Sequence, residues 1–455
     1  MALPCPQLIV LETAVVAPLP AGVLETSLPL TFLDIIWLNS PPVERLFFYR
    51  LSPCNRGHVL SNLKTSLSQA LHAFYPLAGR LRLTPGTTDR YELHYCPGDG
   101  VAFTVTEYDV DVDELVVDGP REVAKILPLV PTLAAEGALL ALQATVLRGG
   151  LAVGMVLHHA ACDGASSTRF LHTWAEAAAG TAAMQLQPTP VVNRSLIKDP
   201  SGFYDVCMRA ATASTGEWEF AKMSDDKLLA TFTLSKQDIQ RIKEVVLVAA
   251  GEAREPPPRC TSLVATLGFI WSCYQRAKDD DEAIRGGNTT YIAIPVNHRS
   301  RMKPDPIPNE YFGNCIGPAM QGAPKAQLLA AGASGLLVAC TAVAAAIEEA
   351  VSSGTRSPEL WGENIREAVM SGGGLLSTAG SPRFRVYDVD FGFGRPAKVE
   401  IVSVARTGAM AVAESRGRNA GDGLEVGISL RPDGMRRFQK CFDDAVAWLH
   451  HHEIS

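Results

Sequence analysis

The sequence contains no C-x-x-C pair, although it has ten cysteines. The cysteines are dispersed, at positions such as Cys5, Cys54, Cys96, Cys162 and Cys441. Dispersed cysteines in a chain of 455 residues predict reduced thiols and not a disulfide framework. The first residues, MALPCPQLIV, carry neither the basic stretch nor the sustained apolar run of a secretory signal. We therefore expect a cytoplasmic protein.

The sequence also has no apolar run that makes a convincing membrane span, which needs ~20 residues. The apolar segment 138–157 is interrupted by Arg148-Gly149-Gly150, and the segment 336–347 is diluted by alanine. We therefore expect no association with a membrane.

Positive charge is not in excess, because the formal net charge is −7. This balance lacks the electrostatic footprint of a nucleic-acid-binding protein, so nucleic acid is excluded as a partner. An anionic ligand must instead meet local basic residues. The composition is globular, with 47% hydrophobic residues, and the length favours two domains.

Helical and strand patterns alternate in both halves of the chain. Helices are predicted at 59–74, 166–179, 235–250, 261–278 and 325–351, with a last one through Trp448. Strands are predicted at 81–83, 90–95, 101–110, 291–297, 399–406, 409–415 and 424–430, with a hairpin formed by 139–147 and 151–158. We find no internal repeat. The pattern predicts an α/β protein with an N-terminal lobe at 1–190, a crossover segment at 191–230 and a C-terminal lobe at 231–455.

The strongest local motif is HHAACDG at 158–164, at the end of a predicted strand. Acyl transfer to a hydroxyl needs a base, and the imidazole of His159 can supply it. Small residues after it would let substrates approach, and Gly164 permits a backbone turn. The histidines could also be satisfied core residues. A metal site is disfavoured, because adjacent histidines on a strand point to opposite faces and no other ligand cluster is evident.

A second motif, DFGFGRP, spans residues 390–396 near the last predicted strands. Its glycines and its proline predict a tight turn, in which structural use outweighs catalysis. It is not the DFG element of a protein kinase, because neither a Gly-rich loop nor an H-R-D element accompanies it.

Together the two motifs resemble those of the plant BAHD acyltransferase family, H-x-x-x-D and D-F-G-W-G, with Phe393 in place of tryptophan. The segments 30–38, 74–81 and 398–415 extend the resemblance over nearly the whole chain. The family implies two chloramphenicol-acetyltransferase-like lobes, with mixed β-sheets, flanking helices and a channel between them that leads to the histidine.

The resemblance also implies residue roles. His159 would be the general base in direct transfer from coenzyme A, without an acyl-enzyme. Asp163 would pair with Arg299 and orient the loop and not relay a proton. Asp390 is often counted among the catalytic residues of the family, but we expect it to be structural, together with Gly392 and Gly394 and, in the first motif, Gly164.

The donor side resembles the family at Arg259, Thr261 and Ser262, where a predicted helix begins. Free N–H groups and the helix dipole suit phosphate or pantetheine oxygens. A simple N-cap is an equally good explanation for either hydroxyl. Acyl-CoA is expected as a cosubstrate, with no permanently bound cofactor.

The run YFGNC at 311–315 is similar to a motif of the anthocyanin and flavonoid glucoside malonyltransferases. The resemblance favours malonyl-CoA as donor and a sugar hydroxyl of a phenolic glucoside as acceptor. The malonyl carboxylate needs an arginine, for which Arg169 and Arg383 are the candidates.

Other functions stay open at this point. The acyl group could be acetyl or hydroxycinnamoyl, and the acceptor could be an amine. A function of another class is a non-catalytic small-molecule binder on the same scaffold. We expect a monomer, and we expect the terminal histidines 450–452 to be exposed and not to ligate metal.

Overall fold

The computed structural model describes residues 7–19, 22–52, 56–133, 135–180, 188–199, 201–213, 226–277, 287–302, 305–353, 361, 364–365, 367–368, 374–417 and 423–451. Of the cysteines, Cys5 and Cys54 lie outside the described residues, and the eight within them are not joined in disulfides.

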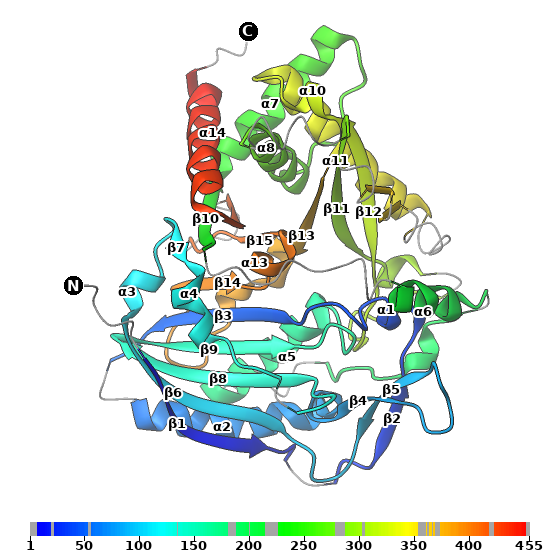
Figure 1. Cartoon of the computed structure of the whole chain (residues 1–455), viewed down its shortest axis with the longest axis vertical. Helices are drawn as coiled ribbons and strands as arrows, with labels where there is room; N and C mark the ends of the chain where they lie inside the picture. Colours follow the sequence, from blue (N-terminus) through cyan, green and yellow to red (C-terminus); the bar gives the residue numbers. More distant parts are fainter. Residues whose placement is uncertain are drawn as a thin grey trace.

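A six-stranded sheet forms the centre of the N-terminal lobe, in the lower part of Figure 1. Its strand order is β1 (Leu8–Val16), β6 (Val101–Asp111), β8 (Leu140–Arg148), β9 (Gly150–Leu157), β3 (Val43–Arg50) and β14 (Lys398–Ile401). Only β6 and β8 pair in parallel. The hairpin predicted from the two apolar runs is β8 and β9, and its turn places Gly149 at φ +68°, where glycine is favoured.

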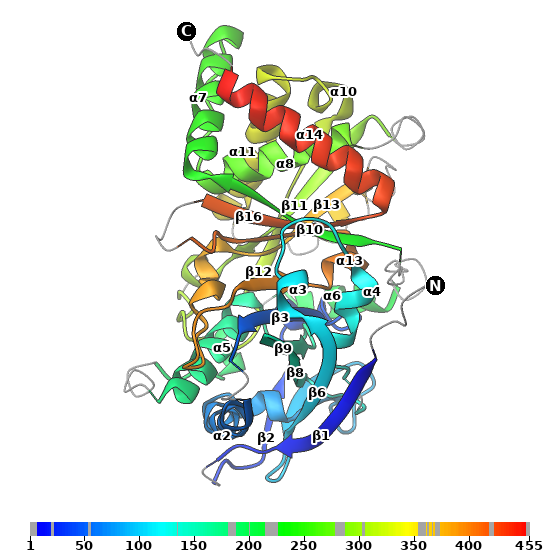
Figure 2. The same cartoon turned by 90° about the vertical axis from the view of Figure 1, so that its left-hand side faces the viewer.

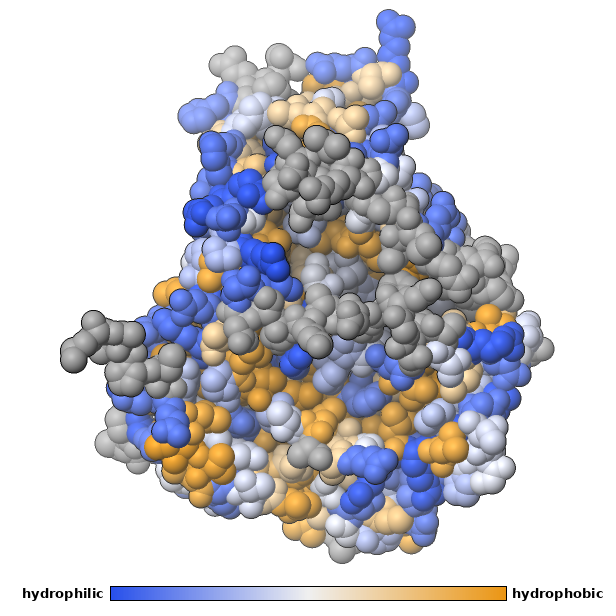
Figure 3. All heavy atoms as spheres, viewed as in Figure 1, coloured by the Kyte–Doolittle hydropathy of each residue, from blue (hydrophilic) through white to orange (hydrophobic). Residues whose placement is uncertain are grey.

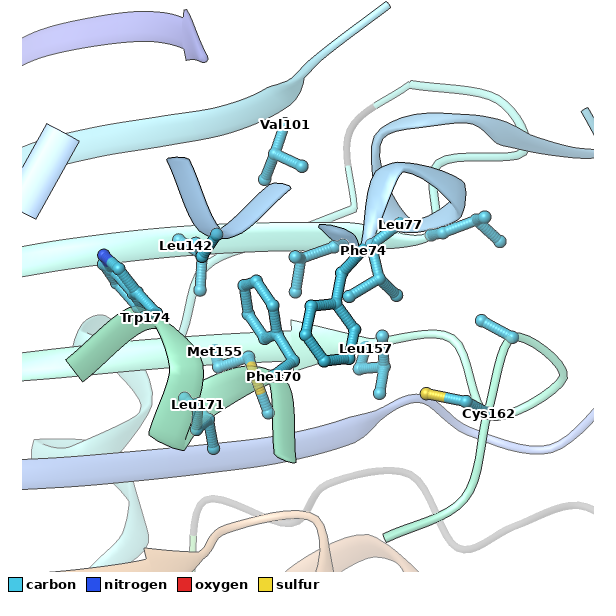
Figure 4. Close-up of a cluster of buried hydrophobic side chains, with 14 of the residues drawn as sticks. Phe74, Leu77, Val101, Leu142, Met155, Leu157, Cys162, Phe170, Leu171 and Trp174 are labelled. Atoms are coloured by element: carbon cyan, nitrogen blue, oxygen red, sulfur yellow. The ribbon is translucent and has the colours of Figure 1, made fainter. Parts of the chain in front are cut away.

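Helices α2 (Arg56–Ala73) and α5 (Gly164–Ala179) pack together against this sheet (Figures 1 and 2). Figure 4 shows part of this core, where the rings of Phe74 and Phe170 meet edge to face with centroids 5.6 Å apart. Trp174 donates its indole N–H to the carbonyl of Leu63 in α2 at 3.0 Å. This packing fixes α5 relative to the end of β9, and therefore fixes the loop 158–163 that joins them.

A seven-stranded sheet forms the centre of the C-terminal lobe. Its order is β12 (Ile316–Pro324), β11 (Thr289–Asn297), β13 (Leu375–Gly380), β15 (Met410–Glu414), β16 (Gly423–Leu430), β10 (Leu228–Ser235) and β7 (Arg121–Glu122). The helices above it in Figure 1 are α7 (Lys236–Ala253), α8 (Ser262–Arg276), α10 (Lys325–Leu328), α11 (Ala333–Ser353) and α14 (Pro432–His451). The predicted capping box opens α7, since Ser235 and Asp238 bond reciprocally.

The remaining elements are short. A three-stranded sheet has the order β2 (Thr26–Pro29), β5 (Tyr91–Tyr95), β4 (Arg80–Leu83). The short helices are α1 (Phe32–Ile35), α3 (Val112–Leu115), α4 (Val123–Ile126), α6 (Phe203–Ala213) and α13 (Val404–Thr407).

Two strands cross between the lobes. β14, from the C-terminal half of the chain, pairs with β3 of the six-stranded sheet. β7, from the N-terminal half, pairs with β10 of the seven-stranded sheet. The predicted lobe boundaries at 190 and 231 remain a prediction, but a single cut in the sequence does not describe this exchange.

Two predicted elements differ from the structure. The helix predicted at 325–351 is divided into α10 and α11, because Gly332 takes φ +80° and interrupts the helical path. The strand predicted at 399–406 ends at Ile401, where the chain turns into α13 and Gly408 closes that helix in a left-handed conformation. In both segments the apolar pattern continues past the point where the element ends, so the pattern alone does not locate that end.

One described helix, α11, is long and apolar enough to span a membrane, over Ala333–Ser352. More than half of that segment is buried inside the protein, where α11 packs on α8 and β12. The apolar surface of α11 is therefore used in the core of the C-terminal lobe.

Candidate active site

A cavity of about 2080 Å³ lies between the two lobes. Its N-terminal wall is formed by β3, by the loop after β9 and by α5, and its C-terminal wall by β11, β13 and the start of α8. On the face seen in Figure 3, apolar residues are exposed in the middle of the molecule as well as over the lower lobe. A space of this size bordered by both lobes can admit two ligands at once.

The loop after β9 places His159 on the cavity wall. The strand ends at Leu157, and the amide of His158 still bonds to the carbonyl of Leu139 at 2.8 Å. The two histidines therefore occupy a turn, and the expectation that they alternate across a strand is wrong. The two rings still occupy different environments, as predicted, because His159 lines the cavity and His158 does not.

The imidazole of His159 stacks on the indole of Trp37, with centroids 3.9 Å apart and an interplanar angle of 11°. Its Nδ1 atom is buried and has no hydrogen-bond partner among the described residues. The other ring nitrogen, Nε2, is therefore the atom that can meet a substrate. Burial lowers the pKa of His159 to about 4, more than the nearby Asp163 raises it, so the ring is neutral at pH 7.

Asp163 and Arg299 form a buried ion pair, with Nη1 2.7 Å from Oδ2 and Nη2 3.1 Å from Oδ1. Asp163 also caps α5 by accepting the amide of Ser166 at 3.0 Å, and it accepts the amide of Cys315 at 3.0 Å. Burial alone would raise the pKa of Asp163, but Arg299 and these amides hold the pKa below its usual value. None of these hydrogen bonds involves His159, as expected of a residue that orients the loop.

A second buried ion pair, not foreseen from the sequence, supports the same loop. Arg194 places Nη1 3.0 Å from both carboxylate oxygens of Asp34, and its Nη2 donates to the carbonyl of Ala161 at 3.1 Å. Asn314, in the YFGNC motif, donates its amide to Asp34 at 3.0 Å and to the carbonyl of His159 at 2.9 Å. The backbone at the base and just after it is thus held by buried polar groups. The one available signal was an acid inside the apolar run LTFLDIIWL, because a buried acid needs a partner.

The structure places Asp390 away from the cavity, whose lining does not include it. Its Oδ1 atom accepts the amides of Gly392 at 2.8 Å and Gly394 at 2.9 Å. Both glycines have positive φ, at +90° and +111°. Phe391 packs on Trp174, with ring centroids 4.7 Å apart. These are the contacts of a turn that anchors the start of β14, and they do not group Asp390 with His159 as a catalytic residue.

Gly164 is required for a reason other than the predicted turn. It is the first residue of α5 and does not adopt positive φ. A side chain there would place Cβ 2.8 Å from the ring of Phe384. Glycine therefore permits close approach between α5 and the segment before β14.

Arg259, Thr261 and Ser262 all line the opposite wall of the cavity. Thr261 is the N-cap of α8, and its hydroxyl accepts a hydrogen bond from the amide of Val264 at 3.3 Å. This hydroxyl therefore has the N-cap role that was the alternative to binding the donor. Ser262 accepts a hydrogen bond from Lys243 of α7 at 3.0 Å. Lys243 was not foreseen, because α7 and α8 meet only in the folded protein. Arg259 on the cavity wall and Lys243, through its bond to Ser262, thus place two cations close to the N-terminus of α8.

Four arginines of the N-terminal wall or of the segment before β14 border the cavity: Arg45, Arg169, Arg383 and Arg385, of which Arg385 pairs with Asp388. Arg169 donates to the carbonyl of Asn309 at 3.2 Å and lies 3.8 Å from Glu310. Arg383 is exposed. Arg45 is buried and was not foreseen, because it lies in a short strand with no local motif around it.

Potential metal ligands gather once among the described residues, at Glu25, His94 and Cys96 beside the three-stranded sheet. None of the three lines the cavity. His450 and His451 are exposed, as expected, although His450 Nε2 also lies 2.7 Å from Asp238 Oδ1. His452 lies outside the described residues.

A neutral imidazole that faces a cavity between two mixed α/β lobes is the arrangement expected of a two-lobed acyltransferase. The comparisons with known proteins agree. A model of the "Transferase family" matches residues 9–445, and the chain belongs to this family, which is the BAHD family of acyltransferases. It is a CoA-dependent acyltransferase of the BAHD type, and the alternative of a non-catalytic binder is dropped.

The similar proteins differ in the acyl group that their names specify. The chain is 32% identical to coumaroyl-CoA:anthocyanidin 3-O-glucoside-6''-O-coumaroyltransferase 2 of Arabidopsis thaliana, over 96% of this chain and 97% of the relative. It is 31% identical to phenolic glucoside malonyltransferase 1 of Arabidopsis thaliana, over 94% and 95%. The crystal structure of vinorine synthase is similar in fold, with a TM-score of 0.67 and 20% identity over 95% of this chain and 96% of that one.

Proposed function

We propose that this enzyme transfers a malonyl group from malonyl-CoA to a sugar hydroxyl of a phenolic glucoside, such as a flavonoid or anthocyanin glucoside. His159 acts as the general base. The observation that carries the proposal is the neutral imidazole of His159, which faces a cavity bordered by both lobes.

The reaction proceeds by direct transfer. Nε2 of His159 accepts the proton of the acceptor hydroxyl, and the oxygen attacks the thioester carbonyl carbon. The tetrahedral intermediate then expels CoA as a thiolate, so the C–S bond breaks while the new ester C–O bond remains. The imidazolium returns its proton to the thiolate. Trp37 holds the ring in place by stacking, and the buried pair of Asp163 and Arg299 holds the loop.

The donor enters from the side of α8. Arg259 and Lys243 supply positive charge near the N-terminus of that helix, where free amides and the helix dipole favour phosphate oxygens. Thr261 and Ser262 supply hydroxyls for the pantetheine arm. The acceptor occupies the remainder of the cavity on the other side of His159.

The acceptor class is inferred from the relatives. Both the coumaroyltransferase and the malonyltransferase named above act on glucosides, according to their names. The malonyl group is inferred from the YFGNC motif and from the arginines on the cavity wall. Transfer of a hydroxycinnamoyl group is the competing function, since a coumaroyltransferase matches the chain at 32% identity.

A donor competition decides between these functions. The enzyme is incubated with equal concentrations of malonyl-, acetyl- and coumaroyl-CoA and a panel of phenolic glucosides and their aglycones, and the products are separated by mass. We expect malonylated glucosides to dominate and the aglycones to stay unmodified. Coumaroylated products in excess would reject the malonyl assignment but keep the glucoside assignment, whereas acylated aglycones would reject the acceptor.

A further inference from the structure

Arg45 is a buried cation that pairs with no carboxylate of the described residues. The residue is 4% exposed. The one hydrogen bond of its guanidinium within the described part of the chain runs from Nη1 to the hydroxyl of Thr168, at 2.9 Å. Its Nε atom is buried and lacks a partner, and no described carboxylate pairs with it. Buried arginines normally have a carboxylate or several acceptors around them, so Arg45 has unused donor capacity.

The guanidinium of Arg45 lies beside the catalytic loop. A side chain at Gly164 would place Cβ 3.5 Å from its Nη2 atom, and the centroid of the Phe384 ring lies 6.0 Å from its Cζ. Arg45 itself lines the cavity. Its positive charge acts on His159, because it contributes to lowering the pKa of that imidazole. The cation is therefore part of the same compartment as the base.

Apart from Arg259 at the start of α8, the other arginines that line the cavity are less suited to bind a desolvated anion. Arg301 donates to the carbonyl of Asn297, Arg385 pairs with Asp388, and Arg406 pairs with Glu44. Arg169 is already engaged with Asn309 and Glu310, and Arg383 is exposed to solvent, which screens its charge. Arg45 is shielded from water, where an added charge-assisted hydrogen bond is strongest.

We propose that Arg45 forms an anion subsite for the acyl end of the donor, which accepts the terminal carboxylate of a dicarboxylic acyl group of the malonyl class. The inference rests on the proposed function and names the residue that selects the donor. A malonyl carboxylate is one methylene away from the thioester carbonyl, so the subsite must border the base, as Arg45 does. The free donors of the guanidinium then bond to the carboxylate, while the Thr168 hydroxyl keeps the side chain in place.

This subsite discriminates by charge. The carboxylate of a malonyl group pairs with the guanidinium of Arg45. An acetyl or coumaroyl group has no carboxylate there and leaves this cation buried without an anion, which is unfavourable. Burial lowers the pKa of Arg45 to about 10, so the side chain is still charged at pH 7 and available to the carboxylate.

The test compares the full-length enzyme with Arg45→Met, which keeps the volume and removes the charge. Arg50→Met on the same strand is the matched control, because Arg50 is exposed and pairs with Asp113 away from the cavity. Arg169→Met and Arg383→Met test the competing arginines. For each protein, calorimetry gives the Kd of malonyl-CoA and acetyl-CoA, and kinetics give kcat/KM for both donors.

The expected result is that Arg45→Met lowers the preference for malonyl-CoA over acetyl-CoA by about tenfold to hundredfold, the value of a hydrogen bond to a charged group. Arg50→Met should keep the wild-type preference. An unchanged preference in a folded Arg45→Met protein overturns the subsite, and a loss in Arg169→Met or Arg383→Met alone does the same. A wild-type enzyme that turns over acetyl- or coumaroyl-CoA but shows no preference for malonyl-CoA in binding or turnover refutes the malonyl assignment and the subsite together.

Discussion

At the scale of single residues, the site depends on an imidazole kept neutral by burial. The pKa of His159 lies at about 4 instead of the usual 6.5. Because the base is active only when unprotonated, kcat/KM should stay level from about pH 8 down to about pH 5 and fall below that. A pH–rate profile of the wild-type enzyme checks this. An acidic limb centred near 6.5 would show that the imidazole is solvated in the working enzyme.

The pairing of Asp163 with Arg299 makes a prediction about stability. Asp163→Asn leaves Arg299 buried without its counter-charge, which costs about 3–5 kcal/mol of unfolding free energy. Urea denaturation measures the loss. The double variant Asp163→Asn with Arg299→Met is the control, and it should lose less than the sum of the two single variants. Strict additivity would show that the two side chains do not act as a pair.

At the scale of elements, the DFGFG turn offers a matched pair of glycines. Both Gly392 and Gly394 have positive φ. A Cβ at Gly392 would lie 3.1 Å from Cα of Ala179, whereas a Cβ at Gly394 would have no described heavy atom within 4 Å. Gly394→Ala should therefore cost only the conformational strain of about 1–2 kcal/mol, and Gly392→Ala should cost more. Thermal unfolding compares them. Equal losses would contradict the close packing of this turn on α5.

Elements with strong local patterns could be predicted from the sequence. The apolar spacing of 59–74 and the two apolar runs around Gly149 correspond to α2 and the β8–β9 hairpin. Where an apolar run fits more than one state, the prediction failed. Gly332 divides the helix predicted at 325–351, and the strand predicted at 399–406 becomes β14 and α13.

The candidate site was predictable only where a motif named its residues. His159 and the pairing of Asp163 with Arg299 came from the resemblance. Arg45 and the pair of Asp34 with Arg194 did not, because Arg194 lies 160 residues from Asp34, and nothing in the sequence around either one indicates the other. Such partners become visible only when the strands and loops are placed in space.

At the scale of the whole molecule, the two lobes are joined by exchanged strands. β14 adds to the N-terminal sheet and β7 to the C-terminal sheet, and Lys398 of β14 bonds to Asp118 at 2.6 Å and to Thr231 of β10 at 2.8 Å. Neither lobe can complete its sheet alone. Differential scanning calorimetry should therefore show one cooperative transition. Two resolved transitions would mean that the lobes unfold independently.

The most direct test of the proposed chemistry is the turnover of His159→Ala with malonyl-CoA and the preferred glucoside acceptor. Loss of a positioned general base should lower kcat by about 10²–10⁴, while circular dichroism shows an unchanged fold. His158→Ala is the matched control, because His158 does not line the cavity, and it should retain most of the activity. Near-normal turnover in a folded His159→Ala enzyme would contradict the assignment of His159 as the base.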